Sequence, residues 1–224
     1  MKTSGTIQAS YHRFRSLTIA ALFTVAVAGV IFLSGSASAA HPQSAQASGL
    51  QGNTLLPSYT FCRTQLITIP WAGASTPYPS HITVARLQSS ISNVSVTLNR
   101  LQHDWYDDID MLLAGPEGQS VLLMSDTGDS CNRETTLTFN DRSPALPDFG
   151  CPFASDTYRP SNYESYPDNF PAPAPAPPYS DHLSAFNGTA PNGTWSLYVV
   201  DDYGIFTGRI SGGWCLNIMV ASSR

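Results

Sequence analysis

The chain has 224 residues, enough for one domain of about 150 residues with extensions. Residues 1–40 carry three of its eleven basic residues and none of its sixteen acidic residues. Without them, eight arginines face sixteen carboxylates, and a net charge of −8 repels nucleic acid and anionic membranes. Divalent cations match such a surface better than polyanions do.

The first forty residues have the pattern of an export signal. Basic residues precede an uncharged, mostly apolar run over residues 16–33, and small residues follow. Positions 37–39, Ala-Ser-Ala, fit the small-x-small rule for cleavage. We therefore expect residues 1–40 to be a signal peptide and the mature protein to be secreted. The alternative is an uncleaved N-terminal membrane anchor, since the apolar run is just long enough to span a bilayer.

After the signal, residues 41–58 are polar, small and aperiodic, which predicts a flexible linker. Residues 59–222 consist of short β-rich runs separated by Gly, Pro, Asn and Asp. The run over residues 93–101 alternates apolar and polar side chains, as in a strand with one buried face. The predicted strands are residues 61–69, 81–87, 93–101, 108–114, 120–125, 135–139, 194–200 and 213–220. Such a series predicts an all-β sandwich or barrel.

A long segment of little predicted regular structure covers residues 141–181. Its Pro/Ala-rich part, residues 170–180, contains the sequence PAPAPAPP at 171–178. This tract predicts an extended polyproline II helix of about 25 Å, at roughly 3.1 Å per residue. A solvated spacer is the favoured interpretation, and a docking site for an aromatic groove is the alternative.

Three blocks of the sequence carry turn signals and core aromatics. Pro116 fixes φ and Gly118 permits positive φ, which predicts a hairpin turn. Two Asn-Gly pairs predict further turns, and two tryptophans are predicted to lie in the core. The distinctive positions of the blocks are His103, Pro116, Gly118, Phe186, Asn187, Gly188, Asn192, Gly193, Trp195 and Trp214.

These blocks resemble the P domain of proprotein convertases. The block that starts at His103 is similar to the family pattern H-T-Y-x-G-D-L-D-I-x-L-x-S-P-x-G-T. Residues 183–202 are similar to LSxFNGxxxNGTWxLxVxD, and residues 207–218 to the ending TGxLxxWxLxx. The resemblance covers residues 65–220. It implies a jelly-roll, galactose-binding-like β-sandwich of about eight or nine strands over residues 59–222.

The resemblance also implies a function. In convertases the P domain packs on the catalytic domain, stabilises it and tunes its calcium and pH dependence. This sequence has no G-x-S-x-G, no H-E-x-x-H and no block similar to the subtilisin-like catalytic motifs. We therefore expect a non-catalytic module that stabilises or binds a protein partner, with a subtilisin-like serine protease in trans as one candidate.

His103 is the histidine with two alternative interpretations. Beside Asp104 it could act as a general base, but a hydrolase also needs a nucleophile and an oxyanion hole. A structural histidine, hydrogen-bonded where a strand ends, is the favoured interpretation.

Four cysteines remain after the signal, and in an exported chain an even number favours disulfides. No CxxC pair indicates a metal knuckle. Of the three possible pairings, we favour Cys62–Cys215, which joins the first strand to the last, with Cys131–Cys151, which closes a local loop.

Several carboxylates lie near turns, and oxygen ligands from several loops are what calcium requires. The candidate ligands of a structural calcium ion are Asp107, Asp108, Asp110, Asp141 and Asp201. Strand alternation would place Asp108 and Asp110 on one face. Asp126 and Asp129 are expected to cap the turn after the strand at 120–125. The alternative is that these aspartates cap turns or are solvated.

A second class of function is an extracellular carbohydrate- or surface-binding module. Jelly rolls often serve as lectins, and exposed aromatic side chains stack on sugars. The residues that would support this alternative are Tyr158, Tyr163, Tyr166 and Tyr179 in the long loop.

Overall fold

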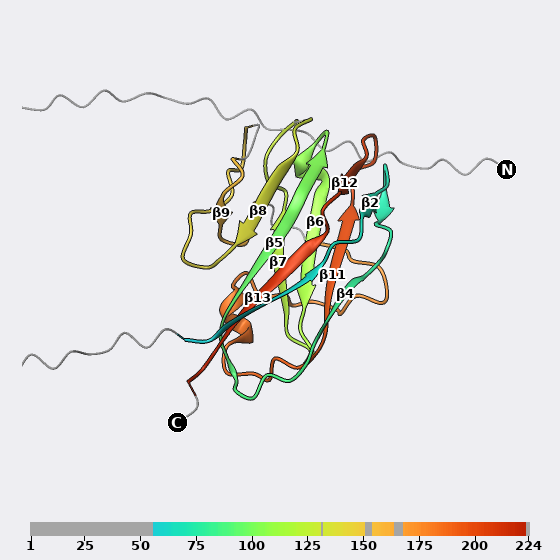
Figure 1. Ribbon diagram of the computed structural model, residues 1–224. Coiled ribbons are helices and arrows are strands. Elements are labelled where there is room, and N and C mark those ends of the chain that lie inside the picture. The colour runs from blue at the N-terminus through green and yellow to red at the C-terminus, as the bar shows by residue number, and fades with distance from the viewer. Residues whose placement is uncertain (1–55, 131, 151–153, 164–167, 223–224) are drawn as a thin grey trace, which may run out of the picture. The chain divides into compact units, whose positions relative to one another are not determined.

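The computed structural model describes residues 56–222, except for residues 131, 151–153 and 164–167. These residues form an all-β sandwich of two sheets that lie face to face (Figure 1). The predicted signal peptide at 1–40 lies outside the described residues, as does most of the predicted linker at 41–58. The first strand begins at Ser58. No helix among the described residues is long and apolar enough to cross a membrane.

The first sheet has seven strands in the order β1-β13-β5-β12-β2, with β8 on the other side of β5 and β9 beside β8. Its strands are β1 (Ser58–Arg63), β2 (Ile67–Ile69), β5 (Ile91–His103), β8 (Thr135–Phe139), β9 (Thr157–Tyr158), β12 (Gly208–Ile210) and β13 (Trp214–Val220). The disulfide Cys62–Cys215 joins directly opposed residues of β1 and β13, which confirms this predicted pair. Cys131 and Cys151 lie outside the described residues.

The second sheet has six strands in the order β10-β7-β6-β11-β3, with β4 also paired to β11. Its strands are β3 (Gly73–Ala74), β4 (Ser80–Val84), β6 (Ile109–Ala114), β7 (Ser120–Ser125), β10 (Ser161–Asn162) and β11 (Gly193–Asp201). Two short 3-10 helices, η1 (Tyr106–Asp108) and η2 (Leu183–Phe186), complete the described elements.

The burial pattern of the strands reflects how many of their faces are covered. Strand β13 alternates between buried apolar and half-buried residues, so one face meets the core. Strand β6 is buried at five consecutive positions, so both of its faces are covered. The inner face joins the main core. The outer face of the second sheet forms a second apolar cluster with Phe170, Ala174 and Tyr179 of the long loop.

The proline tract therefore packs on the sandwich at Ala174, although most of its residues are exposed. It also turns, because the Ala174 N–H donates to the Pro171 carbonyl at 3.1 Å, so it is not one extended polyproline II helix. Tyr78 and Tyr198 donate their hydroxyls to the Pro171 and Pro173 carbonyls at 2.9 and 3.3 Å. Proline lacks an N–H, and these tyrosines satisfy the carbonyls of a segment that cannot pair as a strand.

The prediction of eight or nine strands was too low, because the structure has thirteen among its described residues. The additional elements are two or three residues long, and the predicted strand at 61–69 is divided into β1 and β2. Asp108 also differs from the prediction. It ends η1, so it does not share a strand face with Asp110 on β6.

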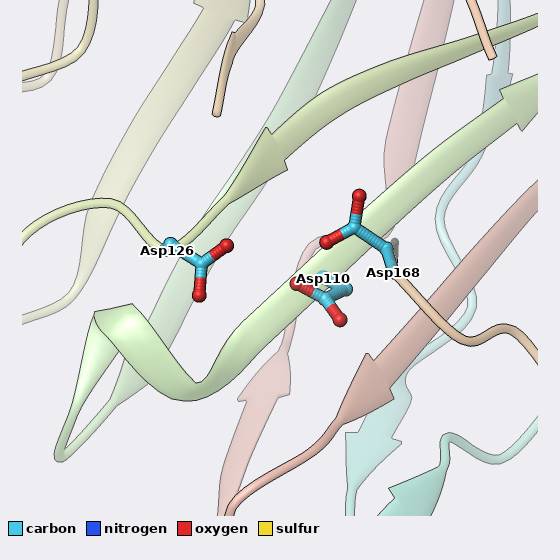
Figure 2. A group of neighbouring side chains, drawn as sticks. All are labelled: Asp110, Asp126 and Asp168. Carbon is cyan, nitrogen blue, oxygen red and sulfur yellow. The ribbon is translucent and has the colours of Figure 1, made fainter. Parts of the chain in front are cut away.

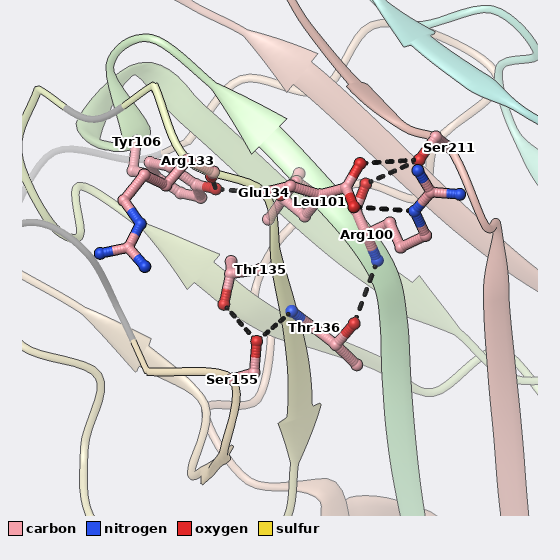
Figure 3. A network of polar contacts seen from close by, with 9 residues as sticks. All are labelled: Arg100, Leu101, Tyr106, Arg133, Glu134, Thr135, Thr136, Ser155 and Ser211. Atoms are coloured by element: carbon pink, nitrogen blue, oxygen red, sulfur yellow. Dashed lines mark hydrogen bonds and ion pairs between the residues drawn. The ribbon is translucent and has the colours of Figure 1, made fainter.

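A polar network surrounds a bulge in β5, where the pairing with β8 shifts between Leu98 and Leu101. Figure 3 shows Arg100 at this bulge, with its Nε 2.7 Å from Glu134 Oε1. The Tyr106 hydroxyl lies 3.1 Å from the Leu101 carbonyl oxygen and 2.9 Å from that of Arg133. These contacts fix the end of β5 and the start of η1, which position the site described next.

Candidate functional site

Carboxylates from several elements gather at one end of the sandwich. In the register of the second sheet, Ile109 at the start of β6 faces Asp201 at the end of β11. Met111 of β6 faces Met124 near the end of β7. The residues around these strand ends therefore meet. The carboxylates at this end are Asp107, Asp108, Asp110, Asp126, Asp168, Asp201 and Asp202.

Three of them form an acidic triad, which we define as Asp110, Asp126 and Asp168 (Figure 2). One carboxylate oxygen from each lies within 4.8 Å of the others. Asp110 comes from β6 and is 3% exposed. Asp126 follows β7 with a positive φ of 50°, a conformation that Asp tolerates better than most residues. Asp168 comes from the long loop just before the proline tract.

The hydrogen bonds of the acidic triad call for an additional positive charge. The Ser125 hydroxyl oxygen lies 2.8 Å from Asp126 Oδ2 and 2.6 Å from Asp168 Oδ1. One hydroxyl carries one proton, so it can donate to only one of the two carboxylates. The Asn162 amide donates to the second oxygen of Asp168 at 3.2 Å. The remaining short contact needs a proton or a cation between the oxygens.

The electrostatics lead to the same requirement. Burial, followed by the charges of Asp202, Asp168 and Asp126, raises the pKa of Asp110 to about 8. A carboxyl with this pKa is largely protonated at neutral pH when no cation is bound. The acidic triad is thus an arrangement in which either a proton or a metal ion could neutralise a buried carboxylate.

The donor set of the acidic triad fits a hard cation. Its ligand atoms are carboxylate oxygens, which suit calcium or magnesium better than zinc or copper. Calcium–oxygen distances of about 2.3–2.6 Å place two ligands of one ion at most roughly 5 Å apart. The 4.8 Å spread meets this condition. Three carboxylates and a serine hydroxyl could supply much of a calcium shell.

A second buried group lies beside the acidic triad. His103 and Asp201 are both fully buried, and Nε2 of His103 lies 3.1 Å from Oδ2 of Asp201, within ion-pair distance but outside hydrogen-bond geometry. The other ring nitrogen of His103 contacts the Trp105 backbone. The other oxygen of Asp201 accepts the Gly204 N–H at 3.0 Å. The pair thus connects the end of β5, η1 and the loop after β11.

Asp108 lies next to this pair. Burial, followed by the charge of Asp201, raises the pKa of Asp108 to about 7. Burial, followed by the same charge, raises that of Asp202 to about 6. The Asp108 carbonyl accepts the Asp202 N–H at 3.1 Å, which holds η1 against the loop after β11.

The structure separates the five predicted calcium ligands. Asp110 belongs to the acidic triad, Asp108 lies near Asp201, and Asp107 is near enough to raise the pKa of Asp108. Asp141 serves another purpose, because its two carboxylate oxygens accept the first N–H groups of η2 at 2.7 and 2.8 Å. It is a cap supplied from a distant part of the chain.

Sequence reasoning missed two members of the acidic triad. Asp126 was expected only to cap a turn, although its position directly after β7 was a usable signal. Asp168 lies 58 positions after Asp110 in a loop without periodicity, and no local pattern indicated where that loop would run.

The first block of motif residues makes a turn and a close contact. Residues 116–118 form the hairpin between β6 and β7, and Gly118 has a φ of 92°. Gly193 packs on this turn, since a Cβ there would lie 2.5 Å from Pro116 Cβ. The two blocks thus meet through a glycine that has no room for a side chain.

The remaining motif residues pack in the core or form hydrogen bonds that hold neighbouring segments. Phe186 packs on Trp195 with ring centres 4.8 Å apart, and both are fully buried. Trp214 is also buried and donates its indole N–H to Ser80 at 3.0 Å. The Asn192 side chain bonds both the N–H and the carbonyl of Leu87.

The other Asn-Gly pair, Asn187-Gly188, closes η2. Asn187 donates its backbone N–H to the Ser184 carbonyl at 3.0 Å, and Gly188 follows with a φ of 82°. Gly188 also donates to the Ile91 carbonyl at 2.8 Å, which connects this turn to the start of β5.

An exposed apolar surface borders the same end of the sandwich. We call Trp71, Tyr203 and Ile205 the rim patch; they are 66, 60 and 67% exposed. Their two loops touch, because a Cβ on Gly204 would lie 2.8 Å from the Trp71 carbonyl oxygen. Phe206, the residue after Ile205, stacks on Trp105 with ring centres 6.0 Å apart.

Comparisons with known proteins give only distant structural similarity. No protein-family model matches the chain, and no curated protein matches it. A solved chain similar to this one comes from the crystal structure of Aeromonas sobria serine protease (ASP) in complex with the chaperone (ORF2). The match is 14% identical, has a TM-score of 0.35, and covers 75% of this chain and 27% of that one. A likeness this weak does not show a shared function.

Proposed function

We propose that this protein is an exported, non-catalytic module that resembles a P domain and docks on a protein partner through the rim patch. The observation that carries the proposal is the exposure of three large apolar side chains on two touching loops. Contiguous exposed apolar surface of this kind is typical of interaction sites. The resemblance of the sequence blocks to P domains makes a subtilisin-like serine protease, encoded separately, the first candidate partner.

The loops of the rim patch are held in place before any partner binds. Asp201 accepts the Gly204 N–H, and its other oxygen faces the buried His103. Gly204 has a φ of 67° and packs on Trp71, so its loop follows a path that a side chain would block. A preordered surface loses less conformational entropy on association.

The charges beside the rim patch favour a partner with basic residues around an apolar centre. Asp107 and Asp202 lie on the elements next to the patch, η1 and the loop after β11. Complementary charge speeds encounter and suppresses wrong partners. A partner with an apolar spot ringed by arginine or lysine would meet both requirements.

A structural calcium ion at the acidic triad is the second part of the proposal. The oxygen donor set, the 4.8 Å spread and the shared Ser125 proton support it. Bound there, calcium would tie β6, the turn after β7 and the long loop to one another. Asp110, Asp126 and Asp168 would be its carboxylate ligands.

The absence of catalysis is supported by the place of His103. The ring is fully buried and its polar neighbours are the Trp105 backbone and Asp201, so a substrate could not contact it. Export is supported by the apolar run and small residues within the first forty positions.

The test measures whether the module prolongs the activity of exported serine proteases from the same source. Each purified protease is heated alone, with the full-length exported protein, and with Trp71→Ser/Ile205→Ser. We expect the wild-type protein to lengthen the half-life of one protease and the double variant to lose this effect. Leu66→Ser, which changes an exposed apolar residue between β1 and β2, is the matched control. Equal protection by all three proteins would contradict docking at the rim patch.

A further inference from the structure

A groove of about 690 Å³ lies beside the outer face of the second sheet, and it shares no residue with the rim patch. Its lining includes residues 159–163, around β10, together with Pro177 of the proline tract and residues 179–182. Leu122 of β7 contributes apolar surface, and Asp168 belongs to both the groove and the acidic triad. The volume is within the roughly 300–1,000 Å³ range of small-ligand sites.

Two tyrosines line the groove in fixed positions. Tyr163 is 42% exposed, and its hydroxyl donates to the Leu146 carbonyl. Tyr179 donates to the Pro175 carbonyl at 2.9 Å and meets Phe170 edge-on with ring centres 5.7 Å apart. Because both hydroxyls are used by the protein, the rings offer mainly apolar surface to a ligand.

The groove is lined by both hydrogen-bond donors and hydrogen-bond acceptors. Asn162 donates to Asp168, so an amide and a carboxylate stand side by side. Across the groove, Asp181 lies 2.7 Å from the Nδ1 atom of His182. Arg159 adds a guanidinium. Neighbouring donors and acceptors suit ligand hydroxyls, each of which donates one hydrogen bond and accepts others.

Charge restricts the ligand further. The chain beyond residue 40 has a net charge of −8, so an anionic ligand would be repelled. Apolar ring surface combined with paired donors and acceptors fits a sugar, which has apolar C–H faces and adjacent hydroxyls. We propose that this groove binds a neutral oligosaccharide, a function that goes beyond docking at the rim patch.

An array of neutral oligosaccharides, including glucans, galactans, mannans and xylans, tests the proposal with the full-length exported protein. Sulfated and uronic-acid glycans are included for comparison. We expect binding to one class of neutral glycan, weakened at least tenfold by Tyr163→Ala and by Arg159→Ala. Tyr59→Ala and Arg63→Ala, both at exposed positions of β1, are the matched controls and should bind like wild type.

Thermal unfolding checks that each variant is folded. If Tyr163→Ala does not fold, Arg159→Ala still tests the groove. Binding to no neutral glycan, binding to acidic glycans alone, or full binding by the folded groove variants would overturn the proposal. The double variant Trp71→Ser/Ile205→Ser should bind the glycan normally. A failure of the rim patch and a failure of the groove are therefore distinguishable.

Discussion

Raising the pH should destabilise the metal-free protein, and calcium should reverse the effect. Burial and neighbouring carboxylates raise the pKa of Asp110 to about 8 and that of Asp108 to about 7. In the unfolded chain an aspartic acid titrates near pH 4. Between about pH 4 and pH 8 the folded protein therefore holds protons that the unfolded chain has released. Its free energy of unfolding must fall as the pH rises through this window.

The size of the effect follows from the two shifted groups. Each contributes a slope of up to about 1.4 kcal/mol per pH unit while it is protonated only in the folded state. Over several pH units, the titration of Asp110 alone lowers the free energy of unfolding of the metal-free protein by a few kcal/mol. This is a large part of the stability of a typical domain. At the proposed site calcium would replace the proton on Asp110, so its stabilising effect should be larger at pH 8 than at pH 5. At a hundredfold excess over its dissociation constant it would add about 2.7 kcal/mol.

The assay is urea unfolding of the purified full-length protein at pH 5, 6, 7 and 8, either metal-free or with millimolar calcium. Asp110→Asn imitates the protonated carboxyl, so it should flatten the metal-free pH profile, stabilise the metal-free protein at pH 8 and abolish the calcium response. Asp181→Asn, at an exposed position, should behave like wild type. Equal calcium stabilisation at pH 5 and pH 8, or a metal-free stability that rises with pH, would refute the reasoning.

Three substitutions test the packing and capping contacts, each by urea unfolding. Gly208→Ala should lower the free energy of unfolding by about 1–3 kcal/mol, because a Cβ would collide with the His103 ring; an unchanged midpoint would contradict this contact. Asp141→Ala should cost about 1 kcal/mol, since it removes the acceptors of the first N–H groups of η2, and Asp141→Asn should restore part of the loss. Removing both Cys62 and Cys215 should cost about 5 kcal/mol in the chain-entropy model, given a sequence separation of 153; a loss below 1 kcal/mol would show that the unfolded chain is otherwise constrained.

The main strands could be predicted because their signals are local. Strands β7 and β8 have the predicted bounds, and the turn at Pro116–Gly118 follows from residue types that fix or relax φ. Short strands such as β10 and β12 carry no such signal, since two or three residues show no periodicity. They exist because longer neighbours offer free hydrogen-bonding groups.

The sequence predicted that aspartates would cluster, but it did not show which of them would form the acidic triad. Asp110 stood out because it follows a turn and begins an apolar strand. Asp168 reaches the acidic triad only because the proline tract folds back over the second sheet, where Phe170 and Tyr179 join an apolar cluster. That packing depends on contacts between distant residues, which a one-dimensional pattern does not contain. The role of Asp141 could not be predicted for the same reason, because it caps a helix more than forty positions away in the sequence.

The rim patch was missed for a related reason. Trp71, Tyr203 and Ile205 lie in short loops, where a sequence does not show which apolar residues stay exposed. Their exposure follows from the register of β3 on β11, which sets two loops side by side at the edge of the sheet.

Photo-crosslinking from the rim patch tests the central claim most directly. A benzophenone amino acid replaces Tyr203 in the protein as expressed in its source, and Tyr59 on β1 is the matched control position. Illumination followed by mass spectrometry identifies what lies against each site. The account predicts one crosslinked exported serine protease from position 203 and none from position 59. The same adducts from both positions, or no protein adduct from position 203, would contradict it.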